Sequence, residues 1–398
     1  MKKWRLAYLV SHPIQYQAPL LRKIAASPDI VLKVFFCSDF SLRKFADPEF
    51  GRSVQWDVPL VEGYEHEFLP SIGPTDKIGR IRPLVYGLTK RLREGRFDAL
   101  WVHGWMHWSH IWAIHVAKQL GIKVLIRGEA NLYQQNGNTL KKWIKDRFLR
   151  WLVANTDAFL AIGSWNREFY LHYGAKPEQI FLMPYAVDND FFQKKAAEAS
   201  STRDILRASL GLEPGRRIIL YASKLTARKR AMDLLEAYAR LTPDGHTEPE
   251  PYLLFIGDGE LRPALEGRAR ELGWKSIRFL GFKNQTELPR YYNLCDVFVL
   301  PSFQEPWGLV VNEVMNAGKA VIVSDQVGAG ADLVRAGKEG AIFAAGNAGA
   351  LARALAFLLE GERYIEMGKC SVEAINHWGF REDIAALRLA LAAVGDTA

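Results

Sequence analysis

The stretch that decides the fold is Val297-Phe-Val-Leu-Pro-Ser-Phe-Gln-Glu305-Pro-Trp-Gly-Leu-Val-Val-Asn-Glu313-Val-Met-Asn-Ala-Gly318-Lys-Ala-Val-Ile-Val-Ser324. Its apolar run at 297–300 predicts a buried strand that Pro301 ends. A helix is expected to start near 306–308, because proline is tolerated in a first helical turn. Gly318 is expected to end that helix, and 320–323 predicts the next strand. The stretch is therefore one strand–helix–strand unit of a parallel sheet.

Two carboxylates in this unit, Glu305 and Glu313, are separated by roughly 12 Å if a helix rises about 1.5 Å per residue. Glu305 is expected at the mouth of the helix, where free N–H groups and the helix dipole attract anions. A nucleotide sugar presents sugar hydroxyls, a diphosphate and ribose hydroxyls, and it would suit such a site. The alternative is an ordinary helix with one capping and one exposed glutamate.

The residues around the pair carry a resemblance. Pro-Ser-x-x-Glu-Pro-x-Gly-Leu and then x-x-x-Glu-x-Met-x-Ala-Gly resemble the Glu-x7-Glu signature of family 4 glycosyltransferases, although Trp307, Asn312 and Asn316 depart from it. The resemblance implies the α/β GT-B fold, with two Rossmann-like, doubly wound parallel-sheet domains facing a cleft. It also implies a retaining enzyme that moves a sugar from a nucleotide-diphosphate donor to a hydroxyl of a glycan or glycolipid, in cell-surface polysaccharide assembly.

The length of 398 residues favours two domains. We expect an acceptor-side domain over 1–193, a polar linker over 194–202 and a nucleotide-sugar-binding domain over 203–380. The resemblance implies that a last helix, at about 381–398, packs back on the first domain. Within the first domain, 6–10 predicts the first strand and 81–93 predicts a helix.

Composition narrows the class of protein. The three cysteines, Cys37, Cys295 and Cys370, lack metal-ligand spacing, which argues for a reducing compartment and against structural zinc. No apolar run is long enough to span a membrane, and the N-terminus does not resemble a signal peptide. The net charge is +8, but no nucleic-acid motif accompanies it. We expect a cytoplasmic protein that binds no nucleic acid.

A basic loop follows the apolar strand predicted at 218–222. Ser223-Lys224-Leu-Thr-Ala-Arg-Lys229 resembles the family pattern Gly-Arg-Leu-x-x-x-Lys, so Lys224 and Lys229 are expected to neutralise a departing diphosphate. A turn containing Phe282 and Lys283 is expected beside the nucleobase. The expected donor-binding set is Ser223, Lys224, Lys229, Phe282, Lys283, Glu305, Pro306, Trp307, Gly308, Leu309, Val310 and Glu313. No cofactor and no metal is required, and Asp188-x-Asp190 is assigned to a family segment rather than to a metal site.

The acceptor side is expected at the carboxyl ends of strands in the first domain, where ligands bind in α/β folds. Its candidates are His12, Gln15, Tyr16, His103 and Glu129. The resemblance places Arg127 where family members often have a catalytic-site His, so Arg127 joins Lys224, Lys229 and Glu305 as a catalytic candidate. Arg127 either binds a phosphate or acidic sugar, or pairs structurally with Glu129.

The segment 140–153 is basic and aromatic, with apolar residues at helical spacing. Either it is a domain helix with a solvated basic face, or it touches an anionic membrane surface at the inner face of the membrane. An anionic or lipid-linked acceptor would suit the second interpretation. Two further functions stay open: a GT-B sugar-nucleotide epimerase and a non-catalytic sugar-nucleotide-binding subunit.

Overall fold

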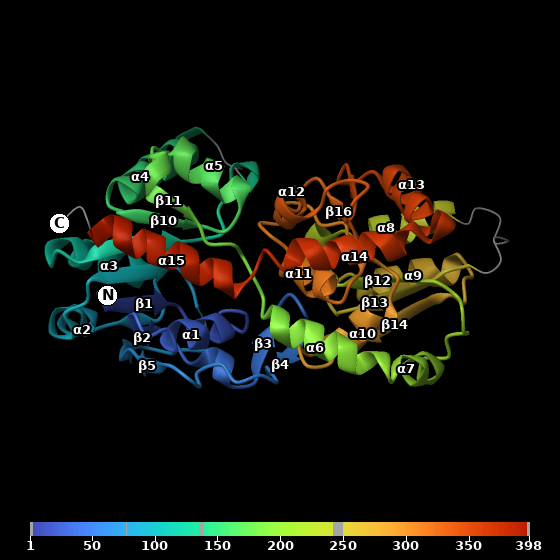
Figure 1. Cartoon of the computed structure of the whole chain (residues 1–398), viewed down its shortest axis with the longest axis horizontal. Helices are drawn as coiled ribbons and strands as arrows, with labels where there is room; N and C mark the ends of the chain where they lie inside the picture. The colour runs from blue at the N-terminus through green and yellow to red at the C-terminus, as the bar shows by residue number, and fades with distance from the viewer. Residues whose placement is uncertain (1–2, 77, 135–138, 242–249, 396–398) are drawn as a thin grey trace. The chain divides into compact units, whose positions relative to one another are not determined.

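The structure is a computed structural model that describes residues 3–76, 78–134, 139–241 and 250–395. The chain divides into two compact units, each with its own parallel sheet (Figure 1). Unit 1 contains Met1–Phe45, Val58–Tyr185 and Phe380–Ala398, and unit 2 contains Ala46–Asp57 and Ala186–Gly379. The segments 46–57 and 186–193, expected in the first domain, thus cluster with unit 2.

Unit 1 is built on a seven-stranded parallel sheet whose central strands carry buried apolar runs. Leu6 of the first strand lies between Leu32 and Ala99 of its neighbours, and all three side chains are buried. Apolar runs of this kind form where helices cover both faces of a parallel sheet. The strands in spatial order are β11 (Ile180–Leu182), β10 (Ala158–Ala161), β9 (Lys123–Arg127), β8 (Ala99–His103), β1 (Trp4–Val10), β2 (Ile30–Phe36) and β5 (Glu65–Phe68).

The helices of unit 1 flank this sheet, and the last of them comes from the end of the chain (Figure 1). They are α1 (Ala18–Ala25), α2 (Leu88–Gly95), α3 (Trp108–Gln119), α4 (Thr139–Ala154), α5 (Ser164–His172) and α15 (Phe380–Gly395). Helix α15 contacts α1, β10 and β11, which confirms the expected return of the C-terminal helix to the first domain. Residues 396–398 of that expected helix lie outside the described residues.

Unit 2 has a six-stranded parallel sheet of the doubly wound kind. Its strands in spatial order are β14 (Ile277–Gly281), β13 (Tyr252–Ile256), β12 (Ile218–Ala222), β15 (Val297–Leu300), β16 (Ala320–Ser324) and β17 (Gly340–Phe343). The chain order reverses between β12 and β15. Open α/β sheets bind ligands beyond the carboxyl ends of the strands at such a point.

Helices surround the sheet of unit 2. They are α6 (Asn189–Ser200), α7 (Arg203–Ser209), α8 (Ala231–Leu241), α9 (Arg262–Glu271), α10 (Leu288–Leu294), α11 (Leu309–Asn316), α12 (Gly328–Leu333), α13 (Ala348–Leu359) and α14 (Arg363–Ile375). The remaining short pieces are the pairs β3 (Phe45–Asp47) with β4 (Arg52–Val54) and β6 (Ser71–Ile72) with β7 (Leu84–Val85), and the 3₁₀ turns Phe40–Leu42, Leu132–Gln134, Pro177–Gln179, Ala227–Lys229 and Glu360–Glu362. Within the described ranges, no helix combines the length and apolar character needed to cross a membrane.

Two local expectations are wrong. The helix predicted over 81–93 begins only at Leu88, because Leu84–Val85 pair with Ser71–Ile72 and Gly87, with a φ of 75°, takes a left-handed conformation before it. Residues 194–200 belong to α6 rather than to an irregular linker. Ala, Lys, Glu and Gln are good helix formers, and the Asp188 carboxylate accepts a hydrogen bond from Phe191 N–H at 3.3 Å to cap the helix.

Candidate functional site

The site in unit 2 is centred on Lys229 and Glu305, which follow the two strands that flank the reversal point. Lys229 Nζ donates a hydrogen bond to Glu305 Oε2, and Arg228 Nη1 lies 3.7 Å from the same oxygen. The side chains of Lys229 and Glu305 are only 12% and 10% exposed. The structure therefore brings together a cation and a carboxylate that lie 76 positions apart in the chain.

The backbone around Glu305 is fixed on both sides. Its N–H donates to the Gln326 carbonyl at 2.9 Å, and its carbonyl accepts from Gly328 N–H at 3.1 Å. The chain then turns at Gly308, whose φ of 94° favours glycine. A Cβ atom there would also lie 2.9 Å from Leu300 Cδ2. The position of Glu305 is thus set by backbone contacts and by a glycine-dependent turn.

Helix α11 begins later than expected, at Leu309. Glu305 therefore precedes the helix, and Glu313 lies just over one turn inside it. The first-turn N–H groups of an α-helix have no partner within the helix, and they carry the positive end of its dipole. Half-buried Leu309 and Val310 stand at this turn and Pro306 just before it. The combination of this helix start and the nearby cations is suited to an anion.

Glu313 is half-buried and accepts a hydrogen bond from Tyr292 Oη at 2.6 Å. Burial raises the pKa of the Glu313 carboxyl to about 7, and the Tyr292 bond acts in the opposite direction. Sequence reasoning missed Tyr292, because nothing in the pattern of α10 indicates which tyrosine faces α11.

Lys224 has partners of its own within unit 2. Its Nζ lies 3.1 Å from Asp47 Oδ2 and 2.6 Å from Glu49 Oε2, and the Lys224 contact lowers the pKa of Glu49. Neither carboxylate was predicted: Asp47 is the last residue of β3, and Glu49 lies in the turn between β3 and β4. Ser223 lies beside Lys224, and its N–H donates to the Ile256 carbonyl at 3.1 Å.

The other expected donor residues are spread around this core. The Phe282 ring packs edge-on against Phe50 at 5.0 Å, and Lys283 Nζ lies over Tyr291. Trp307 is 3% exposed: its Nε1 donates to Asn312 Oδ1 at 2.9 Å. Its ring also stacks on Trp378 at 5.4 Å. The Trp307 side chain is therefore held in the interior of unit 2.

Arg127 in unit 1 is 1% exposed and makes three contacts through one nitrogen. Its Nη2 donates to the carbonyls of Met183 and Pro184 at 3.1 and 2.7 Å and lies 3.2 Å from Asp383 Oδ1. Burial raises the pKa of Asp383 to about 7, and the Arg127 charge lowers it. Of the two alternatives for Arg127, the structural pairing with Glu129 is wrong, because the acidic partner is Asp383 of α15.

Glu129 instead contacts two tyrosines at the carboxyl edge of the unit 1 sheet. It accepts hydrogen bonds from Tyr185 Oη and, at 3.2 Å, from Tyr16 Oη. Both tyrosine pKa values are raised, mainly by burial and then by the Glu129 charge. Tyr16 and Glu129 are predicted acceptor-side residues, whereas Tyr185 is not among them.

The two candidate histidines of unit 1 are kept neutral. His12 Nδ1 lies 2.9 Å from Ser11 Oγ, its ring packs on Phe40 at 4.6 Å, and burial lowers its pKa to about 4. His103 is 9% exposed, and burial, followed by the Arg127 charge, lowers its pKa to about 3. Gln15 is half-buried in the loop after β1.

Comparison with known proteins places both halves of the chain among sugar transferases. Residues 202–374 match the family model "Glycosyl transferases group 1", and residues 41–186 match "Glycosyl transferase 4-like domain". The two matches fall largely on unit 2 and unit 1, respectively.

Three curated relatives show the range of similarity. A D-inositol 3-phosphate glycosyltransferase 2 of Catenulispora acidiphila is 30% identical over 59% of this chain and 54% of its own length. An uncharacterised glycosyltransferase of Methanocaldococcus jannaschii is 34% identical over 30% of each chain. An alpha-D-kanosaminyltransferase of Streptomyces kanamyceticus is 26% identical over 61% of this chain and 64% of its own. The chain thus spans less than two thirds of each of these relatives.

Solved structures share the fold. Anabaena HepE in complex with UDP and glucose has a TM-score of 0.70 and 16% identity, and the match covers 98% of this chain and 100% of that one. Sucrose-phosphate synthase of Thermosynechococcus elongatus has a TM-score of 0.71 and 19% identity over the whole of both chains. With the two parallel sheets, these likenesses confirm the expected α/β GT-B fold.

Proposed function

Because the chain belongs to the group 1 glycosyltransferases of family 4, with the GT-B fold, we propose that it transfers a sugar from a nucleotide-diphosphate donor to an acceptor hydroxyl, with retention of configuration. The observation that carries the proposal is the Lys229–Glu305 pair before helix α11. Support also comes from the solved HepE structures, whose bound molecules are UDP, glucose and UDP-glucose.

The pair is suited to an exchange of partners. In the free protein, the Glu305 carboxylate neutralises Lys229 and lies near Arg228. A donor diphosphate would take over the two cations together with the first amides of α11. The carboxylate thus released is an acceptor only, and it would bind hydroxyls of the donor sugar. One buried ion pair thereby offers a site for each half of the donor.

The remaining donor contacts follow from the same geometry. Glu313, inside α11, would accept hydrogen bonds from the ribose hydroxyls. Lys224 is already paired with Asp47 and Glu49, so a diphosphate would have to compete with two carboxylates for it. We therefore expect Lys229 to contribute more to donor binding than Lys224.

The chemical step needs charge stabilisation at the leaving group. The bond between the sugar carbon and the diphosphate oxygen breaks, and a bond to the acceptor oxygen forms on the face that the diphosphate vacates. The acceptor proton passes to a phosphate oxygen. Lys229, Arg228 and the helix amides would stabilise the departing diphosphate, which is an electrostatic contribution to catalysis. We assign Arg127 a structural role in place of the predicted catalytic one, because its guanidinium is buried against Asp383.

The acceptor side is proposed in unit 1, among His12, Tyr16, His103, Glu129 and Tyr185.

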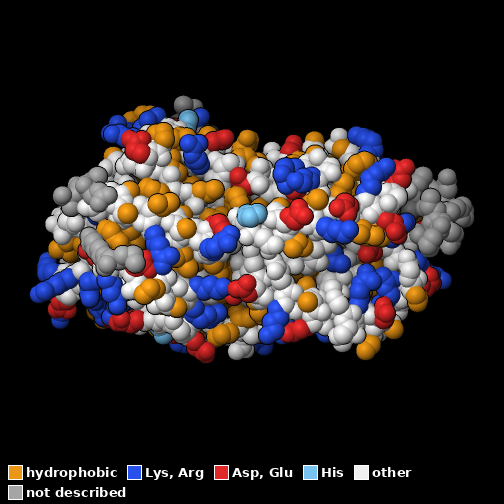
Figure 2. Space-filling view, viewed as in Figure 1, with side chains coloured by type: hydrophobic (Ala, Val, Ile, Leu, Met, Phe, Trp, Pro, Cys, Tyr) orange, Lys and Arg blue, Asp and Glu red, His pale blue; other side chains and the backbone are white. Residues whose placement is uncertain are grey.

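Helix α4 of the same unit combines Lys and Arg with exposed apolar side chains. Figure 2 shows both kinds intermixed over the end of unit 1 that carries α4. Leu140, Trp143 and Ile144 are 66%, 57% and 56% exposed, and Arg147 lies over the Trp143 ring. Such a face is typical of reversible contact with anionic lipid, so we propose a glycan or lipid-linked acceptor.

The test begins with the donor. Nucleoside-diphosphate sugars are screened by thermal shift, because a ligand of the native state raises the melting temperature. Release of nucleoside diphosphate is then measured with and without an acceptor extract. A transferase releases it only with acceptor, an epimerase without acceptor, and a binding subunit in neither case.

The variant that tests the site is Lys229→Ala, with Lys338→Ala as control, because Lys338 is an exposed lysine of the same unit. We expect Lys229→Ala to lose acceptor-dependent release while its circular dichroism spectrum is unchanged, and Lys338→Ala to retain it. Release by Lys229→Ala at the wild-type rate would contradict the proposed site.

A further inference from the structure

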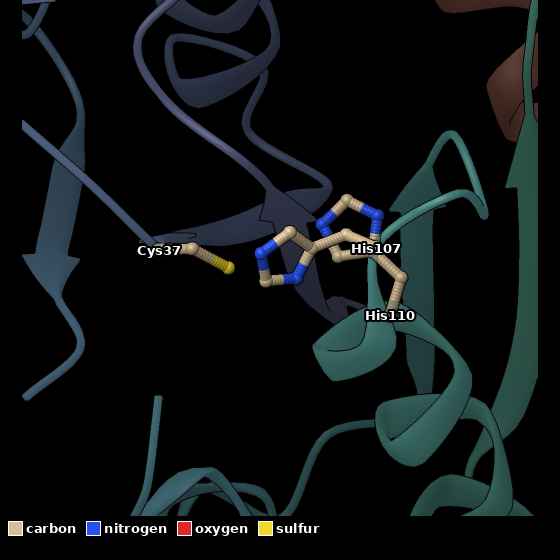
Figure 3. A group of neighbouring side chains, drawn as sticks. All are labelled: Cys37, His107 and His110. Atoms are coloured by element: carbon tan, nitrogen blue, oxygen red, sulfur yellow. The ribbon is translucent and has the colours of Figure 1, made fainter. Parts of the chain in front are cut away.

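A second cluster of reactive side chains lies in unit 1, apart from the residues assigned to the donor. Cys37 directly follows β2, His107 precedes α3 as its N-cap, and His110 stands in the first turn of α3. The three are 1%, 4% and 3% exposed. One ligand-capable atom from each lies within 4.8 Å of the other two. Figure 3 shows the Cys37 thiol directed towards the two imidazoles.

Each imidazole is oriented by the backbone. His110 Nδ1 lies 3.1 Å from the Gly104 carbonyl and donates to it as the N–H tautomer, which leaves a lone pair on Nε2. His107 Nδ1 accepts a hydrogen bond from Ser109 N–H at 3.2 Å, so the neutral His107 ring carries its proton on Nε2. His110 Nε2 is buried without a hydrogen-bond partner among the residues that the structure describes.

Unpaired buried nitrogens need an explanation, because nearly all buried polar atoms in folded proteins are hydrogen-bonded, and an ion is one such explanation. We propose that Cys37, His107 and His110 bind a thiophilic cation, Zn²⁺ or Cu⁺, through the cysteine sulfur and the two imidazoles. Thiolate and imidazole together favour these metals over Mg²⁺ and Ca²⁺, which prefer oxygen.

The distances suit the proposal. Zinc–sulfur and zinc–nitrogen bonds of about 2.3 and 2.0–2.1 Å place tetrahedral ligand atoms about 3.3–3.6 Å apart. The ligand atoms, already within 4.8 Å of one another, are close to that spacing, and binding through His107 Nε2 requires the ring proton to leave Nε2 and the Ser109 hydrogen bond to break. The Gly104 carbonyl on Nδ1 of His110 is the kind of partner that orients a metal-bound histidine.

The protonation states are consistent with this role. Burial lowers the pKa of His110 to about 3 and also lowers the pKa of His107, so both rings are neutral, as ligands must be. Burial raises the pKa of the Cys37 thiol to about 12, so its proton would leave only as the cation binds. A bound cation would tie the end of β2 to the start of α3.

The experiment uses the full chain, stripped with a chelator and then incubated separately with Zn²⁺ and, under anaerobic reducing conditions, with Cu⁺. Metal content is measured after desalting. Incubation with Co²⁺ adds a spectroscopic readout, because a cobalt–thiolate bond gives charge-transfer absorption in the near ultraviolet. We expect one ion per chain, and loss of metal and absorption in Cys37→Ser and His110→Ala.

Cys295→Ser is the matched control, because Cys295 is a buried free cysteine of unit 2. We expect it to keep the metal and the cobalt band. Absence of a stoichiometric ion and of the band in the wild-type chain would overturn the proposal, as would their survival in Cys37→Ser. The wild-type readouts decide the question even if a variant does not fold, and the separate incubations identify the metal.

Discussion

Replacing Asp383 by alanine should destabilise unit 1 by about 3–5 kcal/mol, because it leaves a buried guanidinium without its counter-charge. Asp383 and Arg127 are 0% and 1% exposed, so water cannot replace the lost carboxylate. The carbonyls of Met183 and Pro184 remain as hydrogen-bond acceptors but carry no charge. At about 2–4 °C per kcal/mol for a unit of this size, the thermal transition of unit 1 should fall by about 6–20 °C.

The same helix supplies the control. Arg388 of α15 pairs with Asp29 at 2.7 Å but is 45% exposed, so Arg388→Ala should cost no more than about 1 kcal/mol. The double variant Arg127→Met with Asp383→Leu should recover much of the loss, since it removes both buried charges. Urea unfolding followed by circular dichroism measures all three. The reasoning is refuted if Asp383→Ala is no less stable than Arg388→Ala.

The other predictions concern donor binding, its dependence on pH, and contact with a membrane. Glu313→Ala should weaken binding of the bare nucleoside diphosphate, measured by calorimetry, more than Glu305→Ala does. Glu305→Ala should mainly lower turnover. Equal losses of binding would contradict the assignment of Glu313 to the ribose and Glu305 to the donor sugar. The Glu313 pKa of about 7 lies above its unfolded value of about 4.3, so its contribution to stability is full at low pH and is lost as pH rises through 7. Ionisation over the same range should strengthen ribose binding, so nucleotide affinity should rise from pH 6 to 8 in wild type but not in Glu313→Gln. Wild type should co-sediment with anionic liposomes at low salt, and changing Lys141, Lys142 and Lys145 to Glu should abolish this, since each lysine contributes about 1 kcal/mol; indifference of wild type to the liposomes would remove the membrane part of the proposal.

The sheet of unit 2 could be predicted because its signals are local. The strand at 297–300 and the strand that begins at Ala320 each follow from a few neighbouring residues. The failures have local causes too. The predicted helix over 81–93 ran through Gly87, and the Ala/Lys-rich run before Ser200 was treated as a linker although its composition favours α6.

The partners of the site residues could not be predicted, because side-chain pairing depends on tertiary structure. Arg127 and Asp383 are 256 positions apart, and Lys224 and Asp47 are 177 apart. The cluster around Cys37 was overlooked for the same reason. The spacing between cysteines in the sequence does not indicate that His107 and His110, which follow a different strand, lie near Cys37 in the fold.

The path of the chain has a consequence for recombination with relatives. The chain passes between the two units at four places, after Phe45, Asp57, Tyr185 and Gly379. Consider a hybrid of this chain and a relative with a single junction at the middle of the sequence. In it, Asp47 and Glu49 would face the relative's loop instead of the loop that carries Lys224. Arg127 would likewise face the relative's last helix instead of α15. The exchangeable modules are therefore discontinuous: residues 46–57 have to be inherited together with 186–379, and α15 together with unit 1.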